Sequence, residues 1–246
     1  MNGLWSVVRG PGSLIVGAAA LAVAACGGSS GDHATVQATR DTTAALSSNV
    51  DRGPRTSDRR NTDRRTILFI GTSLTAGYGL DPDSAYPQQI GRMLDSAHMP
   101  WDVVNAGVSG ETSASLLRRV NWLLREPFDV VLIETGANDG LRGIPVAAMR
   151  ANVEQVIQRI KAGRPSARIA LIQMEALPNL GATYTREFHA AYPELARAQG
   201  VDLLPFLLDG VAGRGDLNQA DGIHPNYVGE RIVARNVWKG LRPLLQ

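Results

Sequence analysis

Cysteine is almost absent from this sequence, whose 246 residues include only Cys26. A disulfide within the chain is therefore excluded, and the fold has to be held together by its hydrophobic core. Metal-ligand patterns are missing as well: there is no cysteine cluster, and the four histidines show no His-Glu-x-x-His or similar spacing. We therefore expect neither a structural disulfide nor a metal site.

An excess of charge of one sign is also lacking in most of the chain. Residues 1–65 carry eight arginines and five aspartates, a net charge of +3, whereas residues 66–246 carry 17 basic and 18 acidic side chains, a net charge of −1. Nucleic-acid binding needs a concentration of positive charge, which a nearly neutral domain does not supply. No nucleic-acid partner is expected.

Three common motifs are missing from the places where they would carry function. No expected strand is followed by Gly-x-Ser-x-Gly, the sequence contains no Gly-x-x-x-x-Gly-Lys, and no expected strand is followed by Gly-x-Gly-x-x-Gly. The Gly-x-Ser-x-Gly match at residues 27–31 follows the apolar run near the N-terminus and not a strand. The first motif marks the common lipase fold, the second the P-loop of nucleoside triphosphatases, and the third a dinucleotide site. These absences exclude the usual forms of all three classes.

No apolar run is long enough to span a bilayer, but a shorter one near the N-terminus indicates a targeting segment. Residues 13–25 form an apolar run of 13 residues that follows Arg9, whereas a spanning helix needs roughly 20. The run suits the core of a signal peptide, and it ends in Val-Ala-Ala-Cys-Gly (residues 23–27), which resembles the bacterial lipobox. We predict a lipoprotein signal peptide over residues 1–26, with Cys26 lipidated and the protein on the periplasmic or extracellular face of the cell envelope. The alternatives are an ordinary cleavage site with an incidental cysteine, or an uncleaved short anchor.

Residues 27–65 have the composition of a linker. They are rich in Ser, Thr, Gly, Asp and Arg and contain no periodic apolar pattern, so they cannot bury enough apolar surface to offset the entropy of ordering. We predict a disordered tether. The arginines at its end either contact anionic lipid headgroups or, as we favour, belong to a solvated linker: Arg52, Arg55, Arg59, Arg60, Arg64 and Arg65.

From residue 66 onward, short apolar runs alternate with amphipathic stretches of helical length. Strands are expected at residues 67–71, 103–107, 128–136, 167–174 and 201–206, and helices at 84–97, 112–125, 146–162, 185–199 and 226–241. This alternation predicts a single α/β domain over residues 66–246, with a mainly parallel five-stranded sheet and helices on both faces.

Polar segments fall where the strands of this sheet end. Residues 71–79, 107–113 and 136–143 each follow an expected strand, and residues 221–225 precede the last expected helix. Each could be a simple turn. Ligands of such folds bind beyond the carboxyl ends of the strands, however, and four segments at one edge indicate a site.

A serine nucleophile and its base are available at this edge. Ser73 lies where the first strand meets a helix, so free backbone N–H groups are near its hydroxyl. A serine needs a base, and His224, three residues after Asp221, can present one imidazole nitrogen to the carboxylate and the other to the serine. His33 lies in the tether, whereas His98 and His189 occupy helix-like, partly apolar positions where a structural role is expected.

The remaining requirement is a set of donors for an oxyanion. Gly110 can bring its backbone N–H close to a ligand because it has no side chain, and Asn138 offers a neutral carboxamide. With the N–H of Ser73, these groups form a candidate oxyanion hole. The alternative for Asn138 is self-capping of its own Asn-Asp-Gly loop.

Together these residues resemble the SGNH hydrolases, also called GDSL lipases or esterases. The four residues that name the family match Ser73, Gly110, Asn138 and His224 in order. Residues 136–143, 179–188 and 221–226 resemble most the bacterial periplasmic branch with arylesterase, lysophospholipase and acyl-CoA thioesterase activities. The resemblance implies a flavodoxin-like three-layer α/β/α sandwich, no cofactor, and a mobile loop at residues 140–145 over the acyl site.

Two positions depart from the family pattern. The first motif normally reads Gly-Asp-Ser-Leu, and here Thr72 replaces the aspartate; we expect reduced or retuned activity rather than loss. At residues 175–177, Glu-Ala-Leu replaces a basic residue and differently spaced apolar side chains. Because this loop contacts the acyl chain in the family, a chain-length preference cannot be transferred.

The sequence thus predicts a monomeric serine ester hydrolase with Ser73, His224 and Asp221 as its triad. Its expected partners are a small acyl-ester or lysolipid substrate, with acyl thioesters as a further class, and a membrane reached through the lipid anchor. Two alternatives stay open: an O-deacetylase of cell-envelope or plant polysaccharide, and a catalytically silent binding lipoprotein. Thr72 is the only support for the second.

Overall fold

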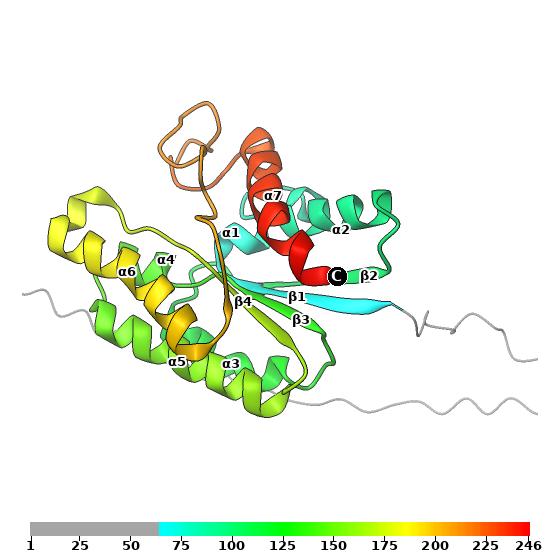
Figure 1. Cartoon of the computed structure of the whole chain (residues 1–246). Helices are drawn as coiled ribbons and strands as arrows, with labels where there is room; N and C mark the ends of the chain where they lie inside the picture. Colours follow the sequence, from blue (N-terminus) through cyan, green and yellow to red (C-terminus); the bar gives the residue numbers. More distant parts are fainter. Residues whose placement is uncertain (1–63) are drawn as a thin grey trace, which may run out of the picture. The chain divides into compact units, whose positions relative to one another are not determined.

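The structure, a computed structural model, describes residues 64–246 (Figure 1). The predicted signal peptide, Cys26, His33 and nearly all of the predicted tether lie outside the described residues. The sheet has five parallel strands in the order β2-β1-β3-β4-β5, which confirms the predicted fold class. The strands are β1 (Arg65–Gly71), β2 (Trp101–Gly107), β3 (Val130–Ile133), β4 (Arg168–Ile172) and β5 (Asp202–Leu204).

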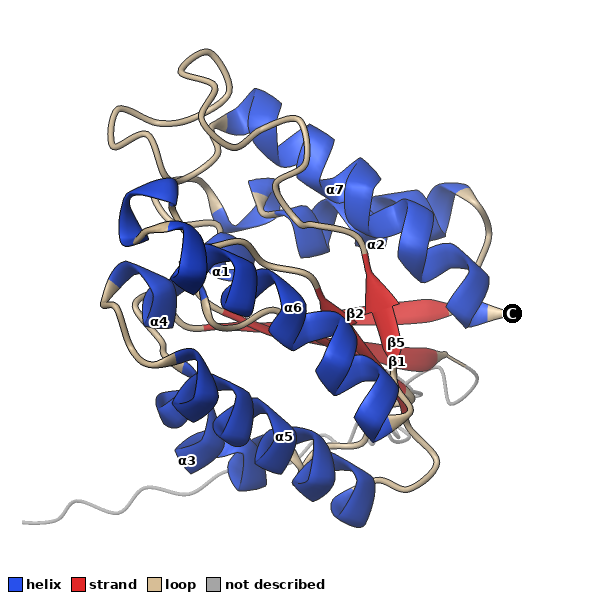
Figure 2. Ribbon diagram, turned by 60° about the vertical axis from the view of Figure 1, so that its left-hand side comes forward, coloured by secondary structure: helices blue, strands red, loops and turns tan. Residues whose placement is uncertain are grey.

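Helices cover both faces of this sheet (Figure 2). On one face α2 (Tyr86–Ser96) packs against α7 (Tyr227–Leu241), and on the other α5 (Val146–Gly163) packs between α3 (Ser113–Leu123) and α6 (Ala182–Gln199). None of the helices within residues 64–246 is long and apolar enough to cross a membrane. The short helices are α1 (Ser73–Ala76), α4 (Ala137–Leu141) and the 3-10 turns η1 (Pro82–Ser84), η2 (Pro178–Leu180) and η3 (Arg242–Leu245).

The core lies on both sides of the central strands. All four residues of β3 are fully buried, because a parallel strand between two helical layers has apolar neighbours on both faces. Helix α5 buries Val153, Val156, Ile157 and Ile160, a spacing of three and four residues that forms one apolar stripe.

The structure differs from the sequence-based expectation mainly at the ends of elements. The apolar runs at residues 128–136 and 167–174 extend beyond β3 and β4, because their last residues are buried in the site instead of continuing the sheet. A helix beginning at Ser73 was expected without bounds, and α4 was not predicted, since four or five residues are too few to show a helical period.

Two arginines assigned to the tether belong to the folded domain instead. Arg65 is the first residue of β1 and pairs with Trp101 of β2, and its guanidinium lies 4.1 Å from the centre of the indole ring. Arg64 forms ion pairs with Asp95 (3.1 Å) and Asp102 (2.6 Å). These contacts correct their assignment to a solvated linker.

Candidate active site

The loop after β1 places Ser73 at the first turn of α1. Thr72 is the N-cap, and its side-chain oxygen accepts a hydrogen bond from the N–H of Leu74 (3.4 Å). Gly71 ends the strand, and a Cβ at this position would lie 1.9 Å from the Thr75 hydroxyl oxygen. Only glycine therefore lets the strand turn this closely into the helix. Ser73 itself is 9% exposed, at the floor of a cavity.

Ser73, His224 and Asp221 form a continuous hydrogen-bonded chain. Ser73 Oγ lies 2.8 Å from His224 Nε2, and His224 Nδ1 lies 2.7 Å from Asp221 Oδ2. The other carboxylate oxygen of Asp221 accepts the backbone N–H groups of Ile223 (2.9 Å) and His224 (3.0 Å). The hydrogen bond from the His224 side chain, followed by these backbone donors, lowers the pKa of Asp221 to about 2. This is the arrangement that the three-residue spacing predicted.

The turn that carries His224 is fixed by neighbours on both sides. Gly222 has a φ of 71°, a conformation that favours glycine, and the carbonyl of His224 accepts the N–H of Gln219 (2.7 Å). The Gln219 side chain donates to the carbonyl of Tyr78 (2.7 Å). Tyr78 also contacts the imidazole of His224, with a ring-to-ring distance of 4.7 Å. Tyr78 was not identified from the sequence, although its place in the polar segment 71–79 was a usable signal.

Gly110 and Asn138 line the same cavity as Ser73 and His224, with a volume of about 190 Å³. Gly110 has a φ of 77°, and its carbonyl accepts a hydrogen bond from Arg142 (3.1 Å). The carboxamide nitrogen of Asn138 donates one hydrogen to the carbonyl of Glu111 (3.0 Å), which leaves its second hydrogen for another acceptor. This bond reaches 27 residues back along the chain, so the Asn138 side chain does not cap its own loop.

A buried hydrogen bond and a partly buried ion pair hold these loops together. Asp139 is fully buried and accepts the N–H of Ser113 (2.8 Å), which ties the third polar segment to the second. Arg119 pairs with Glu111 and also donates to the carbonyl of Ala106 (2.8 Å). None of these five residues was identified from the sequence, because nothing in their local spacing shows which loops will meet.

A buried carboxylate, Glu134, lies under the nucleophile loop. Its side chain is fully buried and accepts hydrogen bonds from the Thr72 N–H (2.7 Å), the Thr72 hydroxyl (3.0 Å) and the Thr75 hydroxyl (2.9 Å). Burial raises the pKa of Glu134, and the hydrogen bonds from Thr72 and Thr75 oppose that rise. Glu134 was missed from the sequence, although an acidic residue directly after an apolar strand was a signal.

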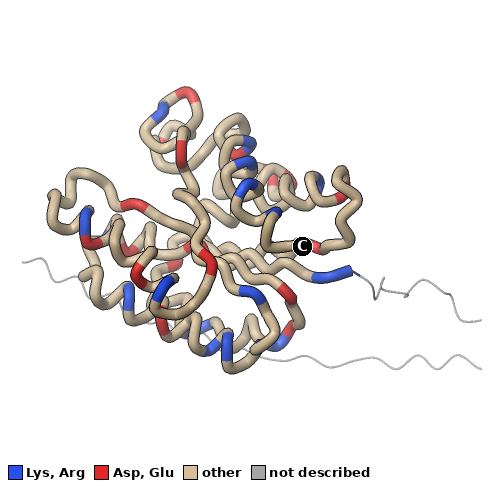
Figure 3. The backbone as a smooth tube through the Cα atoms, viewed as in Figure 1, with Lys and Arg blue, Asp and Glu red and all other residues tan. Residues whose placement is uncertain are grey.

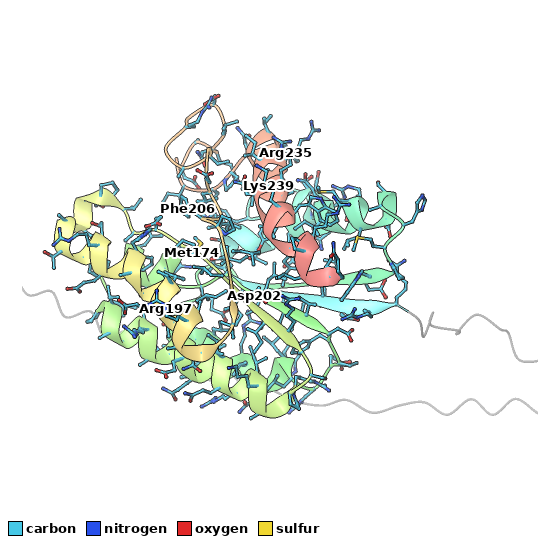
Figure 4. The ribbon with its side chains drawn as sticks, viewed as in Figure 1. Met174, Arg197, Asp202, Phe206, Arg235 and Lys239 are labelled. Atoms are coloured by element: carbon cyan, nitrogen blue, oxygen red, sulfur yellow. The ribbon has the colours of Figure 1, made fainter. Side chains whose placement is uncertain are left out.

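A second, mainly apolar cavity of about 390 Å³ adjoins the first. Leu74, Ala137, Leu141 and Ile223 line both cavities. Its other walls include Met174 and Phe206, which follow β4 and β5 (Figure 4). The two cavities therefore share a wall, and the larger one forms an apolar chamber beside the cavity that holds Ser73.

The loops around this chamber differ in part from the expectation. The predicted loop 140–145 begins inside α4, and Gly140 and Leu141 line the chamber from that helix. Glu175, also in its wall, accepts a hydrogen bond from His189 Nδ1 (2.7 Å). His189 lies in α6 and is exposed, and His98 is exposed just after α2. Neither fills the partly apolar position expected of it.

Residues that could hold a metal ion do not gather in the part of the chain that the structure covers. Across residues 64–246 there is no group of three or more His, Cys, Asp or Glu side chains arranged as ligands. The chemistry available at this site is that of a serine, an imidazole and a carboxylate.

Comparison with known proteins gives a consistent result. Residues 69–232 match the GDSL-like Lipase/Acylhydrolase family. The chain is 37% identical over 182 residues to Esterase TesA of Pseudomonas aeruginosa, covering 74% of this chain and 90% of that protein. It is also 37% identical over 181 residues to Thioesterase 1/protease 1/lysophospholipase L1 of Escherichia coli K12, covering 73% and 85%.

Solved structures agree with these sequence matches. The crystal structure of TesA superposes with a TM-score of 0.70 at 36% identity, covering 73% of this chain and 99% of that one. That of AlinE4, an SGNH-hydrolase family esterase, superposes with a TM-score of 0.62 at 37% identity, covering 75% and 98%. The predicted family and the three-layer fold are thereby confirmed, and the chain belongs to the GDSL-like lipase/acylhydrolase family of carboxylic ester hydrolases.

Proposed function

We propose that this protein cleaves acyl esters by two-step acyl transfer, with Ser73 as nucleophile. The observation that carries the proposal is the Ser73–His224–Asp221 chain of hydrogen bonds, of 2.8 and 2.7 Å, at the floor of an open cavity. A base in contact with a serine, and itself oriented by a carboxylate, is what activates an alcohol for attack on a carbonyl.

In the first step, Ser73 Oγ attacks the ester carbonyl while His224 Nε2 takes its proton. Asp221 orients the imidazole and stabilises the imidazolium. The N–H groups of Ser73 and Gly110 and the free N–H of Asn138 receive the negative charge that develops on the carbonyl oxygen.

The tetrahedral intermediate then collapses. His224 gives its proton to the leaving alcohol or thiol, the carbonyl carbon stays bonded to Ser73, and the leaving group departs. Water repeats the sequence on the acyl-enzyme, with His224 taking a proton from the water and returning it to Ser73 Oγ. The net reaction consumes one water and releases an acid and an alcohol or thiol, so no cofactor is required.

The apolar chamber supports a substrate with an aliphatic acyl chain. It shares a wall with the cavity around Ser73, has a volume of about 390 Å³, and is lined by Leu74, Leu141, Met174, Phe206 and Leu208. An acetyl group would leave most of this apolar surface in contact with water, whereas a longer chain would bury it. Simple acyl esters, acyl thioesters and lysophospholipids are the classes that fit.

The nucleophile is tested with Ser73→Ala. We expect hydrolysis of p-nitrophenyl butyrate to fall by a factor of about 10³ or more, because the residual rate comes from the oxyanion donors and binding alone. A fluorophosphonate probe should label the wild-type protein and not the variant. Wild-type turnover by Ser73→Ala would refute the assignment, and absence of labelling in the wild type would favour a silent binding protein.

The chamber is tested with Ala176→Phe, which adds a ring to its half-buried wall. Excluding about four methylene groups should lower kcat/KM for a long-chain ester by a factor of about 10², with p-nitrophenyl acetate hydrolysed at the wild-type rate. Equal losses on both esters would show that the chamber does not hold the chain. Faster release of acetate from acetylated polysaccharide than of any longer acyl group would favour the deacetylase alternative.

We also propose that the protein is anchored in the cell envelope through a lipidated Cys26. The support is the sequence alone: an apolar run of signal-peptide length ends in Val-Ala-Ala-Cys-Gly, which contains the only cysteine of the chain. Cys26→Ser should move the protein from the membrane fraction to the soluble fraction of the envelope and remove labelling by a palmitate analogue. Unchanged membrane association and labelling would refute the anchor.

A further inference from the structure

A basic groove lies between α2 and α7, on the sheet face opposite α3, α5 and α6. Its volume is about 690 Å³, and four arginines line it: Arg92 of α2, Arg231 and Arg235 of α7, and Arg242 of η3. Lys239 is exposed on α7 between Arg235 and Arg242. We call these five side chains the α2–α7 basic face.

The cations of α7 follow the helical period. Arg231, Arg235 and Lys239 are spaced by four residues, so they lie above one another on one side of the helix. Figure 4 shows Arg235 and Lys239 in succession along α7, and Figure 3 shows the basic positions of this helix.

The acidic side chains of these two helices do not compensate this charge. The only acid of α2, Asp95, is paired with Arg64 at 3.1 Å. The only acid of α7, Glu230, is 1% exposed and accepts the backbone N–H of Tyr86 (2.8 Å). Burial raises the pKa of Glu230 to about 8, so this carboxyl adds little negative charge at neutral pH.

The neighbouring loops bring acidic residues near this face, but not as ion-pair partners of its cations. The Tyr227 hydroxyl donates to the carboxylate of Asp81 (3.3 Å). Arg92 donates to the backbone carbonyl of Asp83 (2.9 Å), and Asn236 donates to that of Asp209 (2.7 Å). Among residues 64–246, none of the five cations forms an ion pair with a carboxylate. Arginines on other surfaces do, as in Arg150–Glu194 and Arg168–Asp202.

Exposed apolar side chains continue this face toward the active site. Tyr227 and Val228 open α7 and are 50% and 54% exposed. Arg231 follows them by four and three residues, so all three side chains lie on the same side of the helix. The partly buried Trp238 lines the groove itself. Basic side chains beside exposed aromatic and aliphatic ones are typical of a surface that binds lipid headgroups and their acyl boundary.

We propose that the α2–α7 basic face binds the surface of membranes that contain anionic phospholipids. The arginines would contact lipid phosphates, with Tyr227 and Val228 entering the headgroup layer. Arg64, where residues 1–63 join the domain, is paired with Asp95 at the same end of α2 as the groove residue Ser96. This proposal does not depend on the esterase mechanism, and it differs from the lipid anchor because it requires negative lipid charge.

The test measures binding of the full-length protein to vesicles by flotation. Two vesicle types are compared at about 0.1 M salt: phosphatidylcholine alone, and phosphatidylcholine with about 30% phosphatidylglycerol, which supplies the surface charge. The readout is the partition coefficient for the anionic vesicles divided by that for the neutral vesicles. The contribution of a lipid anchor cancels in this ratio. Arg231→Gln/Arg235→Gln should lower this ratio by a factor of about 10 or more.

The matched control is Arg186→Gln/Arg197→Gln, which removes the same charge from exposed positions of α6 on the other face of the sheet. It should change the ratio by less than about twofold. Thermal unfolding of both variants checks that each is folded. An equal decrease in both variants, no decrease in either, or a wild-type ratio near one would overturn the proposal. Loss of the wild-type preference in inorganic phosphate at constant ionic strength would instead assign the groove to free phosphate.

Discussion

Thr72 occupies the position where the family motif has an aspartate, and its contacts explain how a threonine can hold the nucleophile loop. Its N–H and its hydroxyl both donate to the buried carboxylate of Glu134, at 2.7 and 3.0 Å. An aspartate side chain at this position would bring a second carboxylate near the first, and the repulsion between them would disfavour two negative charges there. The neutral threonine supplies a donor instead, so Glu134 holds the nucleophile loop without a competing charge.

The contact between Thr72 and Glu134 can be tested with Thr72→Val, which keeps the shape of the side chain and removes its hydroxyl. Loss of a hydrogen bond to a buried carboxylate should destabilise the protein by about 1–3 kcal/mol. It should also lower kcat with little change in KM, because Ser73 is displaced while the acyl chamber is intact. Thr72→Ser retains the hydroxyl and is the control. If Thr72→Val matched Thr72→Ser in both kcat and thermal stability, the contact would have no role in positioning the loop.

The site residues that were identified from the sequence share one property: the residues next to them in the chain already indicate their role. Asp221 and His224 are three positions apart, and Ser73 directly follows a strand. Glu134 and Tyr78 could not be assigned in this way, because their roles depend on neighbours far away in the chain. Glu134 reaches Thr72 across 62 residues, and no local period encodes that contact.

At the scale of elements, one carboxyl links the last helix to the first long one. Helix α2 has no side-chain cap of its own at Ala85, and Glu230 of α7 accepts the N–H of Tyr86 in its place. Because Glu230 is buried without a cation beside it, desolvation raises its pKa to about 8. The capping contact thus joins two helices, and it requires a buried carboxyl that is hard to ionise.

This predicts a pH dependence of stability that Glu230→Gln should remove. Between about pH 4.5 and 8, the folded protein keeps a proton on Glu230 that the unfolded chain releases, so the free energy of unfolding falls as the pH rises. Glutamine can accept the same N–H and carries no charge. The variant should equal the wild type near pH 4 and be more stable at pH 8, by on the order of 2–4 kcal/mol.

Urea unfolding at pH 4, 6 and 8 measures this difference. Asp95→Asn on α2 is a useful comparison, because Asp95 is exposed in its ion pair with Arg64 and its removal should not produce a gain that grows with pH. A stability difference between Glu230→Gln and the wild type that stayed constant across this range would contradict the assigned pKa.

Long helices were predictable and short helices were not. The apolar stripe of α5 fixed its start, predicted and observed at residue 146, and nearly its end. Helices α1 and α4 depend instead on a cap and on left-handed glycines, such as Gly77 and Gly136 at φ of 73° and 98°. Glycine allows this left-handed backbone conformation, but whether a given glycine adopts it depends on the surrounding fold.

For the whole molecule, the main consequence is that residues 64–246 contain every group of the proposed site. Because β1 lies inside the sheet, between β2 and β3, the domain has to include Arg65–Gly71 in full. We predict that a chain of residues 64–246 folds and hydrolyses a soluble short-chain ester with a kcat/KM within about twofold of the full-length value.

The matched control for this prediction is a chain that starts at residue 72 and lacks β1. It should fail to fold, since β2 and β3 would lose the strand that joins them. Circular dichroism and ester hydrolysis measure both outcomes. An inactive but folded 64–246 chain would mean that residues 1–63 contribute to catalysis.

The distance along the chain between Ser73 and His224 has a further consequence, for the time at which activity first appears. The two residues are separated by 151 positions, and a ribosome that adds 5–20 residues per second needs roughly 8–30 s to make that stretch. Throughout this interval the growing chain carries its serine without a base. Each new molecule therefore stays inert toward the esters of the cell that makes it until its C-terminal segment has been synthesised and has docked.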